Sequence, residues 1–482
     1  MSNGLPGIVI VGLAQKSVDE AKERIRAAFA VSPAALPKKR ITINLAPADI
    51  PKDSASLDVA IIVALMAAGK LIKQLDPHAY YYGEVGLDGT IHPTRGIIGK
   101  LRCALANGGS TAYVPVENCP QACLIDGLQI IPIATVSELY LHLTDTATLQ
   151  PYAQPNEEAA QVANTTQQTA PDFADVVDQA RAKRALEIAA AGHHNILLNG
   201  PPGTGKSMLA KAFVSILPPL DQESMLEVTH MYSLVDQNYG RLITEPPFRS
   251  PHHSASTVAL VGGGVKPRPG EISLAHRGVL FLDELPEFSR ANIETLRQPL
   301  EDRQVTVSRA RDTLTFPADF ILVATQNPCP CGYYGSSRDC SCLPFELARY
   351  QKRLSGPILD RIDLHVTVNE VAHADLLATQ RTQESSAAVR ARVLQARARQ
   401  AARYGSPGVY NAHLSTRQIK KVAQLDAPTS SFLNHAADKL GLSARTYMRV
   451  LKLARTIADL DGDDVIAQAH LAEALQYRPT SL

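Results

Sequence analysis

Three short runs in the middle of the chain are almost entirely apolar, at residues 195–198, 279–282 and 320–323. Runs of this kind do not alternate as a half-exposed strand does, and they are typical of strands buried on both faces of a parallel sheet. Helical patterns lie between them. Residues 172–370 therefore predict an α/β domain built on a parallel sheet.

The first 145 residues combine both patterns on a smaller scale. Residues 8–11 and 41–45 predict strands, and residues 58–68 predict an apolar helix. Ser17 is a candidate N-cap for another helix that runs to about residue 29. We therefore expect a mixed α+β domain over residues 1–145.

The other segments differ in composition. Residues 146–171 are rich in Gln, Thr, Ala and Pro, which predicts a flexible linker. Residues 371–482 lack strand patterns, and residues 386–403 and 446–460 have helical periodicity, so a helical bundle is expected there. The arginines along residues 390–403 indicate a solvated or inter-subunit face.

The charge balance limits how this protein could bind nucleic acid. Forty-eight basic residues stand against 47 acidic ones, so any nucleic-acid site has to be a local patch. Aromatic residues make up 5% with no Trp, which argues against base stacking as the main binding mode. The sequence predicts neither a membrane span nor a secretory signal. Seven cysteines in 482 residues favour the reducing cytoplasm over a disulfide scaffold.

One motif carries specific chemistry. Residues 200–207 read GPPGTGKS, follow a predicted strand and open a predicted helix, which is the context of a phosphate-binding loop. Its glycines let backbone N–H groups approach a phosphate closely. Lys206 is expected to pair with the β- and γ-phosphates of ATP, and Ser207 to bind Mg²⁺. The nucleotide contacts expected in this loop are Gly200, Pro202, Gly203, Thr204, Gly205, Lys206, Ser207 and Met208.

Polar residues follow the next two strands. Asp283 and Glu284 come directly after residues 279–282, and this pair of carboxylates favours ATP hydrolysis. We expect Asp283 to hold Mg²⁺ and Glu284 to orient and deprotonate the attacking water. Asn327 follows the strand at residues 320–323 and is expected to hydrogen-bond the same water.

Four of the cysteines form a separate cluster. Cys329, Cys331, Cys340 and Cys342 stand in a CxC-x8-CxC pattern within 14 residues. Four thiolates this close suit a tetrahedral Zn²⁺ site, although CxC is tighter than the usual CxxC. A set of unligated, reduced cysteines is the alternative, and on a loop such thiols would be open to oxidation.

These motifs, in this order and followed by a helical region, resemble those of the AAA+ ATPases. Further stretches narrow the resemblance to the magnesium-chelatase-like ATPases of bacteria and, among them, to the YifB/ComM family. These are NLAPAD at 44–49, FRSPHH at 248–253, PGEISLAH at 269–276, NPCPCG at 327–332 and SGPILDRID at 355–363. The resemblance covers nearly the whole chain. It implies a homo-hexameric ring in which AAA+ cores with helical lids hydrolyse ATP at the subunit interfaces. Family members usually begin with a strand upstream of this start, so the first domain is expected to lack that strand.

The resemblance also assigns roles by position. Arg361, in LDRID, is similar to the arginine finger that reaches a neighbour's γ-phosphate, and a permanently charged guanidinium suits that transition state. Arg445, in LSART, is similar to the second sensor arginine at the start of a lid helix, and Arg449 is the alternative one turn later. Val176 and Val177 lie in the segment expected to pack on the adenine.

Contacts to DNA are expected between the phosphate loop and Asp283, where the segment is longer than an AAA+ core requires. Its glycine-rich stretch with Lys266 and Arg268 is similar to an insert that points into the pore of related ring helicases. Arg309 and Arg311, which lie after Asp283 on one arm of a predicted β-hairpin, are also expected to contact DNA. Repetition around a ring would turn a few charges into a basic channel for single-stranded or branched DNA. Ordinary surface charge is the alternative for each residue.

Residues 1–145 resemble the S5-type, Lon-protease-like domain, with Ser56 at the position of the nucleophile. Serine–lysine chemistry also needs a lysine within hydrogen-bond reach. Ile98 occupies the position of that lysine and Lys100 is two residues away. We therefore expect a non-catalytic domain that binds DNA or shapes the ring.

Three functions are compatible with these features. The favoured one is an ATP-driven DNA motor, a helicase that promotes branch migration during homologous recombination in natural transformation, with recombination proteins as candidate partners. A chelatase-type motor with partner subunits would not be expected to carry the Lon-like domain or the CxC pairs. An ATP-dependent protease would need a base that the sequence does not supply.

Overall fold

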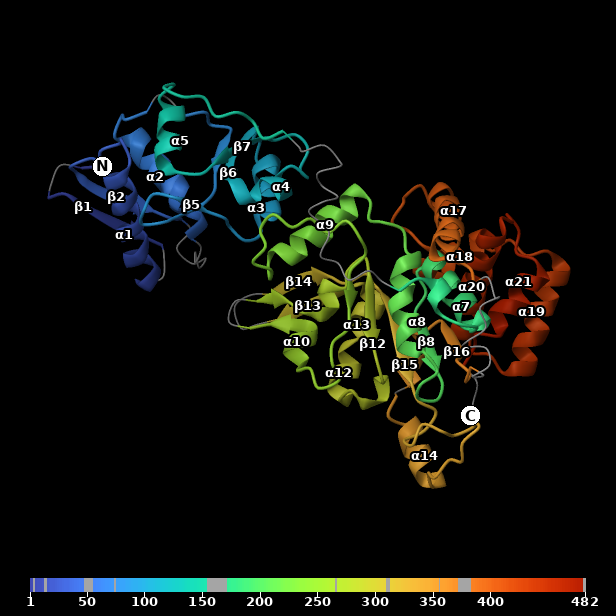
Figure 1. Ribbon diagram of the computed structural model, residues 1–482. Coiled ribbons are helices and arrows are strands. Elements are labelled where there is room, and N and C mark those ends of the chain that lie inside the picture. The colour runs from blue at the N-terminus through green and yellow to red at the C-terminus, as the bar shows by residue number, and fades with distance from the viewer. Residues whose placement is uncertain are drawn as a thin grey trace. The chain divides into compact units, whose positions relative to one another are not determined.

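The computed structural model describes residues 1–2, 5–12, 15–46, 55–72, 75–153, 171–264, 267–308, 313–354, 356–371 and 383–479. The chain divides into two compact units (Figure 1). Unit 1 comprises Met1–Gln167 and Gln222–Ile243, and unit 2 comprises Gln168–Asp221 and Thr244–Leu482.

Unit 2 contains a five-stranded parallel sheet in the order β16-β8-β15-β12-β9. Its strands are β8 (Ile196–Asn199), β9 (Phe248–Arg249), β12 (Val279–Leu282), β15 (Ile321–Gln326) and β16 (Leu364–Thr367). Alternate side chains enter different cores: Leu198 packs in one and Leu197 in the other. Both faces of the sheet are therefore buried, which confirms the α/β prediction and explains why these strands are almost wholly apolar.

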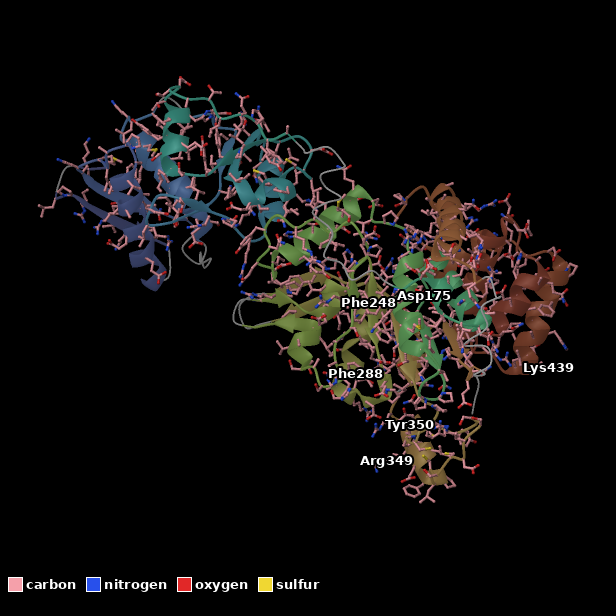
Figure 2. The ribbon with its side chains drawn as sticks, viewed as in Figure 1. Asp175, Phe248, Phe288, Arg349, Tyr350 and Lys439 are labelled. Carbon is pink, nitrogen blue, oxygen red and sulfur yellow. The ribbon has the colours of Figure 1, made fainter. Side chains whose placement is uncertain are left out.

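Helices cover the two faces of this sheet. One face is covered by α7 (Ala180–Gly192), α8 (Lys206–Ala212) and η4 (Phe213–Ile216) together with the lid. The other carries α10 (Thr257–Val261), α11 (Glu271–Leu274), α12 (Arg290–Thr295), α13 (Arg297–Asp302) and α15 (Gly356–Leu359). Phe248 of β9, labelled in Figure 2, stacks on Phe281 of β12 with ring centroids 5.7 Å apart. The remaining short helices are η3 (Phe173–Asp175), η5 (Leu285–Glu287) and α14 (Pro344–Gln351).

The lid is helical, as predicted, and packs within the same unit as the core (Figure 1). Its elements are α17 (Ser386–Tyr404), η6 (Asn411–His413), α18 (Thr416–Val422), α19 (Ala427–Leu440), α20 (Ala444–Asp461) and α21 (Gln468–Leu475).

Two of the arginines of α17 are not part of a solvated face, so that interpretation was wrong for them, and the inter-subunit alternative stays a prediction. Arg390 donates to the Ser215 carbonyl at 2.8 Å, and Arg397 donates to the Ala190 carbonyl at 2.7 Å. These carbonyls lie in the last turns of η4 and α7, where no intrahelical donor reaches them. The guanidinium groups therefore fasten the lid to the core.

Two antiparallel hairpins extend from the core. The first pairs β10 (Gly262–Gly263) with β11 (Arg268–Pro269), and the second pairs β13 (Gln304–Ser308) with β14 (Thr313–Pro317). The second confirms the predicted hairpin. Arg268 is exposed on β11. Lys266, Arg309 and Arg311 lie outside the described residues.

Unit 1 mixes helices with small sheets, as expected for an α+β domain. Strands β3 (Ala79–Tyr81), β6 (Thr111–Pro115) and β7 (Gln129–Ile133) form a parallel sheet, β1 (Gly7–Val11) pairs in parallel with β2 (Arg40–Asn44), and β4 (Glu84–Val85) forms a hairpin with β5 (Ile91–His92). Its helices are α1 (Gln15–Val31), η1 (Ala55–Leu57), α2 (Asp58–Ala68), α3 (Ile97–Ala106), η2 (Val116–Asn118), α4 (Cys119–Ala122), α5 (Val136–Leu143) and α9 (Gln222–Ser233). Ser17 lies inside α1, so it is not the N-cap.

The segment Gln222–Ile243 was expected within the α/β core but belongs to unit 1. The ends of the core on either side of it meet, since Leu220 N donates to the Thr244 carbonyl at 3.0 Å. In unit 1, Met225, Leu226 and Leu242 pack against the buried cluster that contains Ile98 and Leu101 of α3. Helix α9 therefore belongs to unit 1, although its sequence lies between two parts of unit 2.

Among the described residues, none of the helices combines the length and the apolar character that a membrane crossing requires.

Candidate functional site

The phosphate loop connects β8 to α8, at the carboxyl edge of the sheet. Gly203 and Gly205 have φ values of +81° and +85°, which a residue with a Cβ rarely adopts. A Cβ on Gly200 would lie 2.3 Å from the Val368 carbonyl oxygen, so only glycine lets the chain after β16 approach here. The loop thus keeps its backbone uncovered, as the binding of a triphosphate requires.

Lys206 lies across this loop. Its Nζ donates to the carbonyls of Gly200 at 2.6 Å and Pro201 at 2.7 Å, and to Asn327 Oδ1 at 3.2 Å. Burial lowers the pKa of Lys206, while the carboxylates of Asp283 and Glu284 act in the opposite sense. The phosphate loop and Asn327, the residue that follows β15, therefore both contact the same lysine.

The two acidic residues lie next to the loop and are held by a residue that the sequence analysis missed. Ser207 Oγ donates to Asp283 Oδ2 at 3.1 Å. Thr325 Oγ1 donates to Asp283 Oδ1 at 2.6 Å and accepts from Glu284 N at 2.8 Å. Glu284 needs this support because it is a non-glycine residue with φ of +52°. Thr325 is fully buried on β15, two residues before Asn327. A hydroxyl residue at the end of an otherwise apolar strand was the sequence feature that could have identified it.

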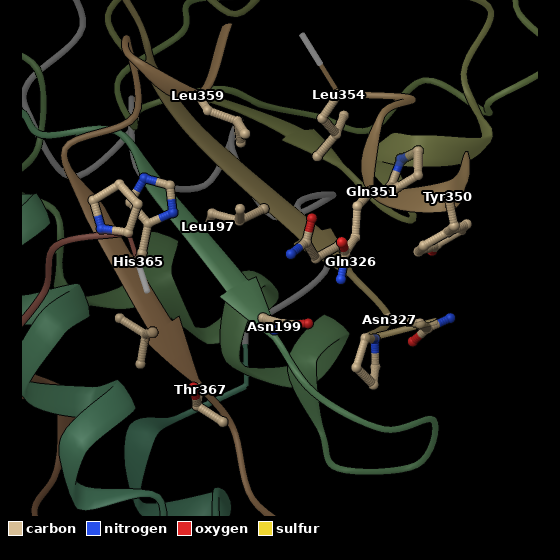
Figure 3. A pocket seen from close by; sticks show the side chains of 14 residues that line it. Leu197, Asn199, Gln326, Asn327, Tyr350, Gln351, Leu354, Leu359, His365 and Thr367 are labelled. Atoms are coloured by element: carbon tan, nitrogen blue, oxygen red, sulfur yellow. The ribbon is translucent and has the colours of Figure 1, made fainter. Parts of the chain in front are cut away.

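Asn327 completes the cluster and borders a cavity. Its Nδ2 lies 3.4 Å from Glu284 Oε1, so it links Lys206 with the carboxylate. A cavity of about 310 Å³ lies beside it, and Figure 3 shows Asn199, Gln326 and Asn327 among the side chains that line it. The structure thus brings together the residues predicted for the phosphates, the metal and the water.

The fit of ATP and Mg²⁺ can be judged from the donor set. Uncovered backbone and a lysine suit phosphate oxygens, and a serine hydroxyl beside a carboxylate suits Mg²⁺. The segment expected at the adenine lies at the same edge of the sheet, because Gln179 Nε2 donates to the Asn369 carbonyl at 2.7 Å just after β16. Val177 is half-buried there, Val176 is buried in the core, and Met208 is exposed.

The two predicted arginines lie together, bound to one acidic residue. Arg361 and Arg445 both pair with Glu301 of α13, with Arg445 Nη2 at 2.8 Å from Glu301 Oε1. Arg361 also donates to the Pro357 carbonyl at 2.6 Å. Neither arginine contacts the phosphate loop in the part of the chain that the structure describes. Nothing in the sequence pointed to Glu301, one of two adjacent acidic residues at the end of a short polar helix.

Arg449, the alternative to Arg445, has a different environment. It is only 6% exposed and donates to the carbonyls of Ile362 at 2.7 Å and Asp360 at 2.9 Å. These contacts join α20 of the lid to the chain around Arg361. Arg445 is about half exposed and has the freer guanidinium.

The four predicted cysteines converge. The Sγ of Cys329 lies 3.3 Å from that of Cys331 and 3.8 Å from that of Cys340, and Cys342 accepts from Cys331 N at 3.4 Å. A tetrahedron of thiolates about 2.3 Å from Zn²⁺ has edges of about 3.8 Å, so the cluster fits this ion. Backbone N–H groups that donate to sulfur, such as Tyr334 N to Cys329 at 3.3 Å, are of the kind that support thiolate ligands.

Two residues of the Lon-like site lie among the described residues of unit 1. Ser56 is buried in η1, and Ile98 is fully buried at the position where the resemblance requires a lysine. Burial lowers the pKa of Lys100 to about 8.

Comparisons with known proteins agree with the fold. Three family models match: "Subunit ChlI of Mg-chelatase" over residues 1–118, "Magnesium chelatase, subunit ChlI" over 172–376, and its C-terminal part over 383–478. Competence protein ComM of Haemophilus influenzae is 41% identical over 484 residues, covering 99% of this chain and 93% of ComM. YifB of Salmonella typhimurium is 42% identical over 488 residues, covering 99% of this chain and 92% of YifB. The magnesium-chelatase 67 kDa subunit of Chlorobaculum tepidum is 30% identical over 160 residues, covering 32% of this chain and 23% of the subunit.

The parallel sheet, the phosphate loop with its two carboxylates and the helical lid define an AAA+ ATPase of the magnesium-chelatase type. Within that class, the chain belongs to the YifB/ComM family.

Proposed function

We propose that the protein is a homo-hexameric, ATP-driven DNA motor that promotes branch migration during the recombination of incoming DNA. The observation that carries this proposal is the position of Arg361. This residue belongs to the same unit as the phosphate loop but lies too far from it to contact a nucleotide bound there. The ATP site of one copy is therefore completed by the arginine of another, which is the arrangement of a ring.

The separation can be worked out from the sheet. The chain beside Arg361 runs next to the start of β8, since Asp363 N and Leu364 N both donate to the Asn195 carbonyl at 3.0 Å. The phosphate loop begins at Gly200, about 17 Å further along an extended strand at about 3.3 Å per residue. An arginine side chain reaches only about 7 Å from its Cα. Arg445, which shares Glu301 with Arg361, would act on the neighbour's nucleotide as well.

Each residue of the site then has a chemical task. The phosphate loop and Lys206 bind the triphosphate, Glu284 accepts the proton of the attacking water, and Asn327 orients that water. Mg²⁺ held by Ser207 and Asp283 would neutralise charge on the phosphates. Arg361 of the adjacent copy stabilises the charge that spreads over the γ-phosphate oxygens in the transition state.

Two observations favour DNA as the load of this motor. Arg268 is exposed on a short hairpin whose partner strand is Gly262–Gly263, which can contribute little to a core. In addition, a relative matched over 93% of its length is a competence protein, whereas the chelatase subunit is matched over 23%. A chelatase-type motor stays the second candidate on the family models alone. The proposal includes Zn²⁺ at the four-cysteine cluster.

The decisive experiment uses purified full-length protein and synthetic three- and four-stranded DNA junctions. We expect ATP-dependent dissociation of the junctions by the wild type and none by Glu284→Gln, which should still bind ATP. Elemental analysis should find one zinc per chain. Active ATP hydrolysis that DNA does not stimulate, with junctions left intact, would exclude the DNA motor and favour the chelatase-type alternative.

A further inference from the structure

The four-cysteine cluster lies directly beside the ATP site in the chain. Asn327, which bonds Lys206 and Glu284, is separated from Cys329 by one proline. Cys329 is fully buried, and its sulfur lies within 3.8 Å of those of Cys331 and Cys340. A ligand that fixes Cys329 also fixes the backbone that carries Asn327.

The same loop also packs on the phosphate loop. Gly332, next to Cys331, has φ of +87°, and a Cβ built on it would lie 2.6 Å from Cδ and 2.7 Å from Cγ of Pro202. Proline cannot move its ring carbons as a flexible side chain moves its end, because the pyrrolidine ring fixes its backbone. The cysteine loop therefore abuts the loop that binds the phosphates, within the same compact unit.

We propose that the four-cysteine metal site positions the nucleotide site: its Zn²⁺ holds Gly332 against Pro202 and, through Cys329, holds the side chain of Asn327 over Lys206. This inference depends on one part of the proposed function, namely that the protein binds ATP and zinc, and it does not depend on the DNA motor. Loss of the metal frees the loop at both points, so the phosphate loop and Asn327 lose their alignment together. Because groups that orient a site from behind typically change affinity or activity about 10- to 100-fold, nucleotide affinity is expected to fall about tenfold without zinc.

The chain offers a matched pair of variants for this inference. Gly335 lies three residues after Gly332 in the same loop and has φ of +74°, but a Cβ on it would meet no atom within 4 Å. Gly332→Ala and Gly335→Ala therefore impose similar backbone strain on the loop, and only the first disturbs the contact with Pro202. A difference between them reports the contact itself.

The experiment measures three quantities on the full chain without DNA. They are zinc content, the dissociation constant of a fluorescent ATP analogue, and the thermal unfolding midpoint. A zinc-selective chelator under reducing conditions should raise that constant about tenfold, and one equivalent of Zn²⁺ should restore it. Gly332→Ala should retain zinc and bind the analogue about tenfold more weakly, while Gly335→Ala should stay within about twofold of the wild type.

Several results would overturn the proposal. They are stoichiometric zinc release with unchanged nucleotide affinity, equal effects of the two alanine variants, and a purified chain that neither holds nor takes up zinc. Since every readout is made without DNA, a failed junction assay leaves this inference standing. Conversely, unchanged nucleotide affinity after zinc release, or equal effects of the two variants, leaves the DNA motor and its zinc site standing, whereas a chain without zinc contradicts the zinc part of both proposals.

Discussion

The strongest test of the ring is the replacement of Arg361 by alanine. If Arg361 acted on its own nucleotide with its side chain fully extended, the two charges would still lie about 10 Å apart, and their Coulomb energy would be about 1.7 kcal/mol at an effective dielectric constant of 20, and less across water. That separation also exceeds the Debye length of about 8 Å at physiological salt. Such an arginine changes hydrolysis by no more than about 20-fold.

An arginine in contact with a neighbour's γ-phosphate has a much larger effect. It typically contributes about 10³- to 10⁵-fold to hydrolysis, or about 4–7 kcal/mol. We therefore expect Arg361→Ala to reduce ATP turnover at least about 10³-fold while leaving ATP binding nearly unchanged. Arg353→Ala is the control, because Arg353 likewise pairs with a glutamate, Glu287 at 2.8 Å, and donates to a proline carbonyl, although its side chain is more exposed than that of Arg361.

ATP turnover by rings that mix two variants provides a second measurement. A Lys206→Ala copy lacks a working phosphate loop but keeps its arginine, and an Arg361→Ala copy has the reverse defect. When the two are mixed equally, about a quarter of the interfaces combine an intact loop with an intact arginine, so about a quarter of wild-type turnover should return. Full activity of pure Arg361→Ala, or no recovery on mixing, would refute the reasoning.

Three further outcomes are expected. Glu284→Gln should bind a fluorescent ATP analogue normally and release phosphate about 10²- to 10⁴-fold more slowly, and normal release would contradict its role as the base. Burial, with a smaller effect from Arg449, lowers the pKa of His365 to about 4. An unfolded chain therefore binds a proton between about pH 6.5 and 4 that the folded chain does not, and stability falls as pH falls through this window, by about 2 kcal/mol from pH 7 to 5. Denaturant titrations of His365→Gln should show a smaller fall than those of the wild type or of the exposed control His435→Gln. A chain that lacks residues 1–153 should aggregate, because Met225 and Leu226 lose the residues that bury them. A chain that also lacks residues 222–243, with a short glycine link from Asp221 to Thr244, should elute as a compact species on size exclusion. Identical elution of the two deletions would contradict the assignment of α9 to unit 1.

Much of the secondary structure of unit 2 could be predicted, because the sequence patterns that indicate it lie within single strands and loops. Residues 279–282 are confirmed as β12 without change, since a strand buried on both faces has to be apolar throughout. The phosphate loop was predictable for a similar reason, because its glycines serve a backbone conformation that no other residue adopts easily.

Other features depend on partners that a sequence does not name. An amphipathic helix such as α9 shows which face is buried, but not that unit 1 covers it. Glu301 is an ordinary acidic residue until the fold brings Arg361 and Arg445 to it. The contact of Gly332 with Pro202 joins residues 130 positions apart, and the two-residue strand β9 is too short to leave a pattern.

The return of residues 222–243 to unit 1 means that the polypeptide crosses between the units three times. A protease that nicked the chain once, between residues 153 and 171, would therefore divide the covalent chain without dividing the protein. The amino-terminal fragment would still hold α9, which stays covalently part of the carboxyl-terminal fragment. Such a nicked molecule should run as one species until a denaturant separates the pieces.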